Sequence, residues 1–346
     1  MKRIQLIVVC IVTGVLLARA QERTFRVVCY NVENYFDCVD DSLTNDSEYL
    51  PGGMRAWNYS KYQQKQASIS KVIANIGGWE APALVGLCEI ESDKCLWDLT
   101  KYSGMKNMKY NYVHYESPDA RGVDVALLYQ PQQFKVIDSK PIRITFPFSP
   151  SSKTRDLLYV KGIAHTNDSL HIFVCHFPSR LGGELESEER RNYVASVVRT
   201  QVDSLFTRNK KANILIMGDF NDYPTNKSMN TILKALNPSA NISEGKLYNL
   251  MYPLHAAGKG SHKHNGEWGA LDQLIVSANL LQNKTFSCKK ANVYDADFLL
   301  VDDEKFLGKQ PFRTYNGMKY QAGYADHLPV YVDFEIVDKN SLQSEK

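Results

Sequence analysis

Residues 214–224 read ILIMGDFNDYP, in which four apolar residues lead through a glycine into a polar group. A short apolar run of this length is typical of a strand buried inside a sheet. The polar group includes Asp219 and Asn221, which follow the strand directly and are therefore carried by a rigid element. This stretch indicates a buried strand of an α/β protein whose end bears reactive side chains.

Five further strand candidates begin or end at polar residues in the same manner. These residues are Asn31 and Glu33 after strand 25–30, Glu89 after strand 83–88, His176 at the end of strand 170–176, Asp272 at the start of strand 271–277, and Asp326 and His327 before strand 328–334. Polar groups at strand ends converge when their strands share one edge of a sheet. Six strand ends with such residues are more than we expect if these residues were polar only because they face solvent. We therefore expect that they form one common site.

The rest of the chain alternates short β-rich runs with amphipathic helices, the pattern of a single α/β domain without linkers or repeats. Helices are predicted at 59–76, where Gly77 and Gly78 follow, and at 184–206, which opens with four glutamates. Further strands are predicted at 123–129 and 157–164, the latter paired with 170–176 through the turn residues Asn167 and Asp168. Segments 37–57, 238–270 and 294–321 read as long polar loops.

The first twenty residues have the three-part pattern of a secretory signal peptide. Lys2 and Arg3 precede an apolar run over 4–17, and Ala18-Arg19-Ala20 follows as a small-residue cleavage site. The run is too short for a typical membrane anchor, although an uncleaved anchor is the alternative. We therefore expect a signal peptide at 1–20, a single domain over 21–346 with a polar tail from about 337, no transmembrane segment in the mature chain, and export to the periplasm or the extracellular medium.

Charge argues against a dedicated DNA-binding protein. Residues 1–20 hold three basic residues and no acidic one, so the remaining chain has 38 of each sign. A protein that binds the duplex tightly usually carries a basic surface.

Six cysteines remain after residue 20, but no CxxC or Cys/His spacing suggests zinc. Cys29, Cys88 and Cys175 lie in apolar runs as small hydrophobic residues.

The strand-end residues favour metal-assisted chemistry on a phosphate ester. Carboxylates and Asn oxygens without cysteine are a hard ligand set that suits Mg²⁺, with Mn²⁺ as a second possibility. The two histidines and an Asn can donate hydrogen bonds to an anion, and Asp219 could orient and deprotonate a water molecule. Together they describe hydrolysis in which positioning and charge neutralisation lower the barrier.

Seven motifs make this interpretation specific. They are YNVENYFD from residue 30, LVGLCEIES from 84, RGVDVALLY from 121, HFPSR from 176, IMGDFNDYP from 216, LDQLIVS from 271 and ADHLPVYVDF from 325. In this order the set resembles the endonuclease/exonuclease/phosphatase superfamily across residues 25–335. The resemblance implies a four-layer α/β sandwich, with two central mixed β-sheets packed face to face and flanked by helices.

The resemblance also implies roles for individual residues. The metal ligands would be Glu89 as the main carboxylate, with Asn31, Glu33, Asp326 and, near the metal or just behind it, Asp272. The catalytic residues would be Asp219, which orients the attacking water, His176, Asn221 and His327, which hold the phosphoryl oxygens, and Asp124 as the acid partner of His176. His327 is also a candidate general base, with Asp326 holding its ring tautomer.

Substrate contacts are expected from residues beside the motifs. Arg121 and Arg180 could touch a phosphate, although ordinary solvated charges are the alternative. His262, His264 and Trp268 lie in the loop before Asp272 and could form a lip over the site, with the Trp stacking on a base or ring, or else a loop packed by its own Trp.

The string Gly-Ala-Leu-Asp-Gln at 269–273 lacks the Trp-Cys-Asp-Arg signature of inositol phosphatases and the Arg that exonuclease III-type enzymes place before this Asp. We therefore hypothesise an exported Mg²⁺-dependent phosphoesterase, a phosphodiesterase by preference, acting on nucleic acid, a lipid headgroup or a small organophosphate, and without a stable protein partner. The alternatives are a secreted DNA or RNA endonuclease, a sphingomyelinase-like lipid phosphodiesterase, and a non-catalytic protein that binds phosphate ligands on the same scaffold.

Overall fold

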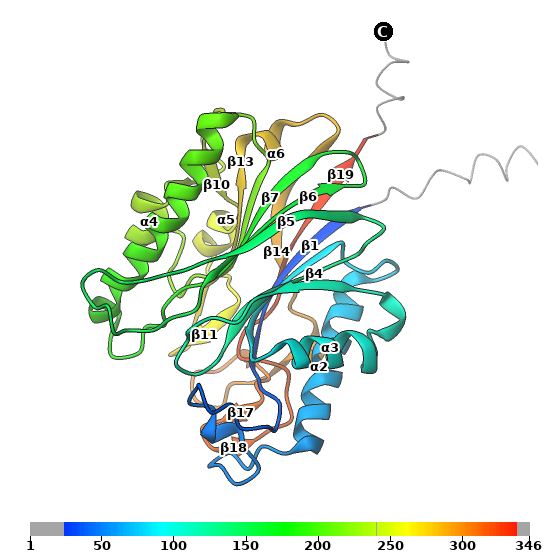
Figure 1. Cartoon of the computed structure of the whole chain (residues 1–346), viewed down its shortest axis with the longest axis vertical. Coiled ribbons are helices and arrows are strands. Elements are labelled where there is room, and N and C mark those ends of the chain that lie inside the picture. Colours follow the sequence, from blue (N-terminus) through cyan, green and yellow to red (C-terminus); the bar gives the residue numbers. More distant parts are fainter. Residues whose placement is uncertain (1–23, 240, 338–346) are drawn as a thin grey trace, which may run out of the picture.

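The computed structural model describes residues 24–239 and 241–337, arranged as two large β-sheets with helices outside them (Figure 1). The predicted signal peptide and all but the first residue of the polar tail lie outside the described residues. Within the described part of the chain, no helix combines the length and the apolar character needed to cross a membrane.

The first sheet has six strands, and β1 and β2 are its parallel pair. Its spatial order is β14 (Phe286–Val293), β19 (Val330–Ile336), β1 (Phe25–Tyr35), β2 (Leu84–Ile90), β4 (Asp124–Tyr129) and β3 (Asn111–His114). The second sheet has seven strands, of which β7 and β8 pair in parallel, as do β9 and β10. Its order is β5 (Phe134–Ile142), β6 (Leu157–Ala164), β7 (Ser169–His176), β8 (Ile214–Asp219), β13 (Asp272–Ser277), β10 (Leu247–Asn249) and β9 (Ala235–Leu236).

Helices and three small hairpins complete the structure. The helices are α2 (Tyr59–Gly77), α3 (Asp93–Tyr102), α4 (Glu184–Arg208), α5 (Tyr252–Ala256) and α6 (Ala278–Gln282). The hairpins pair β11 (His262–His264) with β12 (Glu267–Gly269), β15 (Leu300–Asp302) with β16 (Lys309–Pro311), and β17 (Tyr315–Asn316) with β18 (Lys319–Tyr320).

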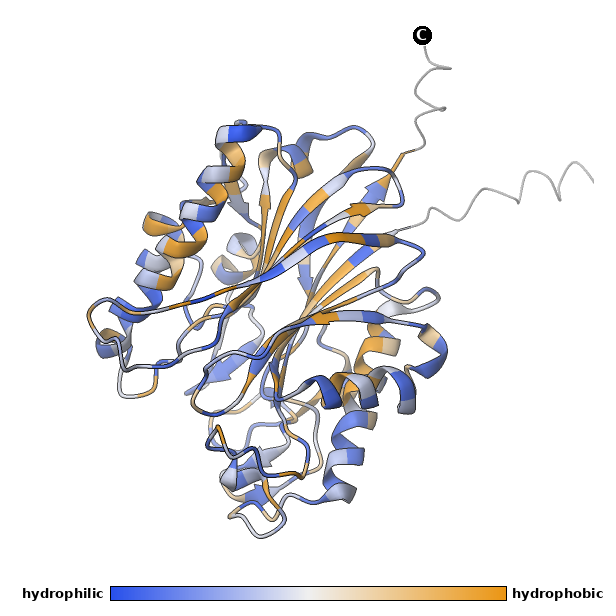
Figure 2. Ribbon diagram, viewed as in Figure 1, coloured by the Kyte–Doolittle hydropathy of each residue, from blue (hydrophilic) through white to orange (hydrophobic). Residues whose placement is uncertain are grey.

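Alternation along the buried strands creates the layers. In β1, Val27 and Cys29 pack into the core between the two sheets, while Val28 and Tyr30 face the core beneath α2 and α3. The residues of strand β8 alternate in the same way. Met217 and every second residue along the strand lie in the core between the two sheets, and the residues between them pack against α4. Successive strand residues point to opposite faces, so strands apolar on both faces carry two cores each. Figure 2 shows this hydrophobic colouring along the central strands. The predicted four-layer α/β sandwich is confirmed.

Two of the predicted polar loops contain unexpected structure. Segment 238–270 includes β10, which pairs with β13, together with α5 and the β11–β12 hairpin. Segment 294–321 includes the β15–β16 and β17–β18 hairpins. These strands have two or three residues each, which is too short to produce a readable alternation. The six cysteines of the described residues are all unpaired, five of them buried.

Candidate functional site

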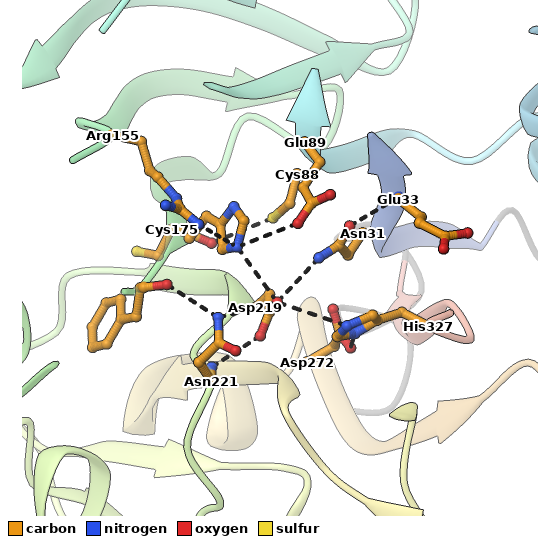
Figure 3. A network of polar contacts seen from close by, with 12 residues as sticks. Asn31, Glu33, Cys88, Glu89, Arg155, Cys175, Asp219, Asn221, Asp272 and His327 are labelled. Atoms are coloured by element: carbon orange, nitrogen blue, oxygen red, sulfur yellow. Dashed lines mark hydrogen bonds and ion pairs between the residues drawn. The ribbon is translucent and has the colours of Figure 1, made fainter. Parts of the chain in front are cut away.

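The topology brings the predicted polar strand ends to one edge shared by both sheets (Figure 3). Strands β1 and β2 run in parallel and end near Asn31 and Glu89, while β7 and β8 run in parallel and end at His176 and Asp219. Strand β13 runs the opposite way, so its first residue, Asp272, pairs with Asp219. The carboxyl ends of the parallel strands and the first residue of the antiparallel strand β13 therefore lie at the same edge of the two sheets.

Asp219 lies at the centre of this group. Its Oδ2 accepts hydrogen bonds from Nδ2 of Asn31 at 3.0 Å and of Asn221 at 3.4 Å, and its Oδ1 accepts the Asn221 backbone N–H at 2.9 Å. Nε2 of His176 and of His327 lie 3.6 and 3.9 Å from Oδ2. Burial raises the pKa of Asp219 to about 6. The carboxylate is thus a buried acceptor ringed by two amides and two imidazoles.

The backbone at the site is held in uncommon conformations. Glu33, Glu89 and Asn221 have φ of 56°, 67° and 50°, values that non-glycine residues seldom adopt. Gly218 has φ 152°, and a Cβ there would lie 1.8 Å from the Cys175 carbonyl oxygen. Such strain concentrates at functional sites, where the surrounding structure enforces it.

His327 is held by Asp272, and not by Asp326 as predicted. Nδ1 of His327 lies 2.6 Å from Oδ2 of Asp272, which also accepts a hydrogen bond from the Ser261 hydroxyl. Burial opposes the charge on His327, but the carboxylates of Asp272 and Asp219 outweigh burial and raise its pKa well above the ordinary value. Asp272, predicted as a metal ligand, thus contacts the ring of His327 and also lies beside Asp219.

His176 contacts Arg155 in place of Asp124. NH2 of Arg155 lies 2.9 Å from Nε2 of His176, and because a guanidinium can only donate, Nε2 is the acceptor in this arrangement. Burial and the neighbouring charges of Arg155 and Arg121 lower the pKa of His176 well below its ordinary value, so the ring is neutral. Asp124 instead faces His114, at 3.5 Å, and the predicted Asp124–His176 pair is not formed.

The predicted metal ligands separate into two groups. Asn31 and Glu89 lie beside Asp219, and Oε1 of Glu89 lies 3.9 Å from His176 and 3.7 Å from Arg121, beyond hydrogen-bond distance. Glu33 and Asp326 are instead bridged by Arg313, whose NH2 lies 3.2 Å from Oε1 of Glu33 and 2.9 Å from Oδ2 of Asp326.

Buried charges accompany the bridge at Glu33. Oε2 of this residue accepts the Thr314 backbone N–H at 2.7 Å. Burial, reinforced by Asp326, raises the pKa of Glu33 to about 7. Burial also lowers the pKa of the nearby Lys65 to about 8. Glu33 and Asp326 thus share a close cationic partner in Arg313, whereas Oε1 of Glu89 has only the more distant Arg121, and its Oε2 accepts the Asn34 backbone N–H at 2.9 Å.

The predicted substrate residues also separate. Arg121 is half exposed beside Glu89, and His262 packs its ring 4.8 Å from that of His327. Exposed His264 stacks loosely on His262. Trp268 pairs with Lys263 on the other face of the β11–β12 hairpin and packs against the helix-side core, so it does not stack over the site.

Arg180, predicted as a phosphate contact, makes several contacts within the protein. Its Nε donates to the Asn221 carbonyl at 2.7 Å, and its NH1 and NH2 contact Glu184 at 3.0 Å and Asp222 at 3.3 Å. The guanidinium also lies over the ring of Tyr223. Arg180 thereby fixes the loop that carries Asn221.

Arg155, Arg313 and Lys65 are site neighbours that sequence reasoning missed. Arg155 lies two residues before β6, Arg313 lies in a segment predicted as a loop, and Lys65 is a buried lysine on α2. The available signal for Lys65 was its place on the apolar face of the helix, since a lysine is rarely fully buried without a partner.

The sequence model of the Endonuclease/Exonuclease/phosphatase family matches residues 26–336, most of the chain. A comparison with curated protein sequences returns no match. Among solved structures, an endonuclease/exonuclease/phosphatase family protein from Bacteroides thetaiotaomicron is 15% identical with a TM-score of 0.56, covering 92% of this chain and 100% of that chain.

Two further solved structures carry functional names. A mannosyl-6-phosphatase from Bacteroides thetaiotaomicron is 16% identical with a TM-score of 0.54, covering 90% of this chain and 99% of that chain. The human Nocturnin catalytic domain with bound sulfate is 15% identical with a TM-score of 0.55, covering 92% and 95%. At these identities the structures demonstrate a shared fold.

Proposed function

Because the chain belongs to the endonuclease/exonuclease/phosphatase family, whose members hydrolyse phosphoric esters, we propose that it is a Mg²⁺-dependent phosphodiesterase. The observation that carries this proposal is the Asp219 carboxylate, buried between Asn31, Asn221 and the two imidazoles at the edge shared by both sheets. Such a group can hold a water molecule on one side of a phosphoryl group and donate hydrogen bonds to its oxygens.

The donor set fits a hard divalent cation. Among the described residues no group donates a hydrogen bond to Oε1 of Glu89, the side chain of Glu89 is 13% exposed, and the amide of Asn31 lies on the neighbouring strand. These two residues would hold Mg²⁺, with Mn²⁺ as a substitute, since both ions prefer oxygen ligands. When bound, the cation neutralises charge on the phosphoryl oxygens. Glu33 and Asp326 would act through Arg313, which presents an exposed guanidinium to an anionic substrate.

Different side chains of the site would accept the proton of the attacking water and stabilise the negative charge on the phosphoryl group. Asp219 is ionised at neutral pH and is placed to orient the attacking water and accept its proton. His327 is protonated, with Nδ1 tied to Asp272, so Nε2 donates to a phosphoryl oxygen and the residue serves as a donor, not as the general base. Asn221 adds a second donor. A donor role for His176 requires Arg155 to release Nε2.

The test is hydrolysis of bis-p-nitrophenyl phosphate with Mg²⁺, with Mn²⁺ and with chelator. We expect chelator-sensitive turnover, with Asp219→Ala and His327→Ala each lowering kcat at least about a hundredfold. Asp302→Ala, a change at an 82% exposed carboxylate, is the matched control and keeps full activity. Turnover that survives in both site variants, or that ignores chelator, contradicts the proposal. A parallel panel of plasmid DNA, single-stranded RNA and p-nitrophenyl phosphate assigns the substrate class.

A lipid substrate is the second candidate, favoured by exposed apolar side chains beside the site. Val39 and Leu43 are 64% and 86% exposed in segment 37–57. The segment borders the site because Asn45 N–H donates to the Ala120 carbonyl, next to Arg121. Apolar side chains of this kind insert into lipid interfaces. If lipid is the substrate, Leu43→Ser lowers turnover of sphingomyelin vesicles but not of the soluble aryl diester. Equal effects on the two substrates contradict this candidate.

We also propose that the protein is exported, on the strength of the sequence pattern at 1–20. Expression of the full chain in a bacterial host should place the protein outside the cytoplasm, with Gln21 as the first residue found by N-terminal sequencing. An intact N-terminus on cytoplasmic protein would contradict export.

A further inference from the structure

A second cluster of metal-ligating groups lies away from the proposed catalytic residues. His114 ends β3, Glu116 follows it, and Asp124 opens the neighbouring strand β4. Ligand atoms of these three residues all lie within 4.8 Å of one another. Across from them, Asp156 directly precedes β6 of the second sheet. The cluster thus spans the line where the two sheets meet.

His114 and Asp124 are the buried groups of this cluster, whereas the side chain of Glu116 is exposed and lies 3.9 Å from Nδ1 of His114. Within residues 24–239 and 241–337, both carboxylate oxygens of Asp124 and Nε2 of His114 have no hydrogen-bond partner, although each side chain is only 3% exposed. An ionised carboxylate buried without a partner costs several kcal/mol, so such groups normally pair or coordinate a cation. Arg143, 3.0 Å from Oδ1 of Asp156, neutralises that residue only.

A small cavity separates the two sides of the cluster. Its volume is about 10 Å³, and Asp124 and Asp156 line it together with Tyr115, Pro141 and Leu157. Two ligands of one tetrahedral cation, each bonded at about 2.0–2.1 Å, lie roughly 3.3 Å apart. The 3.5 Å between Nε2 of His114 and Oδ2 of Asp124 is near that separation and long for a hydrogen bond.

We propose that His114, Glu116, Asp124 and Asp156 form a structural site for a divalent transition-metal cation that joins the two sheets. One imidazole with carboxylate oxygens is a borderline ligand set, which suits Zn²⁺ or Mn²⁺ better than Mg²⁺ or Ca²⁺. The site is separate from the proposed phosphodiesterase centre because its residues contact neither Asp219 nor Glu89 in any hydrogen bond or ion pair of the described residues. The bound cation fixes β3 and β4 of the first sheet to the start of β6 in the second sheet.

The test measures metal content and unfolding, not activity. Metal-free protein prepared with chelator is dialysed against Mn²⁺ or Zn²⁺, and bound metal and Tm are measured for the wild type, Asp124→Asn and His114→Gln. Asp138→Asn, at an exposed position of β5 in the second sheet, is the control for loss of a carboxylate. Glu89→Gln removes the proposed catalytic ligand and isolates the second site.

We expect the wild type, Asp138→Asn and Glu89→Gln to bind the cation at the cluster, and their Tm to rise with metal. Asp124→Asn and His114→Gln should bind at least about tenfold more weakly and show no such rise. Without metal, Asp124→Asn should unfold at the wild-type temperature or above, because an unpaired buried charge is gone. Equal metal content and equal Tm response in Asp124→Asn and the wild type would overturn the proposal, and His114→Gln decides if Asp124→Asn fails to fold.

Discussion

The contact of Asp272 with His327 sets the charge of the proposed anion donor. We predict that Asp272→Asn moves the alkaline limb of the activity profile to lower pH, because the carboxylate that most strongly raises the pKa of His327 is lost. The measurement is kcat against pH for the wild type, Asp272→Asn and the exposed control Asp302→Asn. An unchanged alkaline limb in Asp272→Asn would show that His327 does not titrate there.

The same pair makes folding stability depend on pH with a defined sign. The folded pKa of His327 lies above its unfolded value of about 6.5, so its contribution is fully present below that value and is lost as pH rises through the folded pKa. Urea unfolding should therefore show a larger destabilisation by Asp272→Asn at pH 6 than at pH 10. A difference that grows with pH contradicts the assignment.

Gly218 is required by the strand that carries Asp219. We predict that Gly218→Ala costs more than about 2 kcal/mol of the free energy of unfolding, because its Cβ would overlap the Cys175 carbonyl oxygen and φ is 152°. Gly52→Ala, with open space and an ordinary φ, is the control in urea unfolding. If Gly218→Ala lowered the free energy of unfolding no more than Gly52→Ala does, β8 would be able to move away from the Cys175 carbonyl without strain, which contradicts this prediction.

At the residue scale, the sequence predicted which polar residues gather but not all of their partners. Asp326 precedes His327 in the chain, yet Asp272 reaches the ring because β13 pairs antiparallel with β8. The pairing of two strands brings together segments that are far apart in the chain, and the residues next to Asp272 in the sequence carry no pattern that indicates it. Arg155 and Arg313 were missed for the same reason, since each reaches the site from an irregular segment.

Helix α2 shows how element packing follows from spacing. Asn58 caps its first turn, Gly78 ends it at φ 66°, and Ile73 is buried in the core above the first sheet. We predict that Ile73→Ala costs about 2–5 kcal/mol of the free energy of unfolding, from lost burial and a cavity. Gln63→Ala, on the exposed face of the same helix, should cost less than about 0.5 kcal/mol. Similar costs in thermal or urea unfolding would contradict this packing.

At the element scale, long periodic segments were predicted and short or irregular ones were not. The helix at 59–76 is predicted by its apolar spacing, the helix at 184–206 by its opening glutamates, and the hairpin at 157–176 by its turn residues. Strand β5 was missed because it is an edge strand, largely exposed, with a proline at position 141. An edge strand packs on an apolar core with only one of its faces, so the pattern of apolar residues that predicts a strand is weak in its sequence.

At the scale of the whole molecule, the two sheets approach closely at Gly86. A Cβ there would lie 2.9 Å from Sδ of Met217 on the opposite sheet. We predict that Gly86→Ala costs about 1–3 kcal/mol, because the core is overpacked. Met217→Ala in that background should cost less than in the wild type, which a double-mutant cycle of urea unfolding detects. Additive costs would show that the sheets separate without strain.

The order of strands in the first sheet bears on when the enzyme becomes active during synthesis. Strand β19, which follows His327, lies between β14 and β1, although it is the last strand of the described chain and β1 is the first. Until the ribosome has made β19, the first sheet is open along β1 and no following strand holds His327 at the site. A nascent chain that lacks β19 would therefore lack the proposed phosphodiesterase activity.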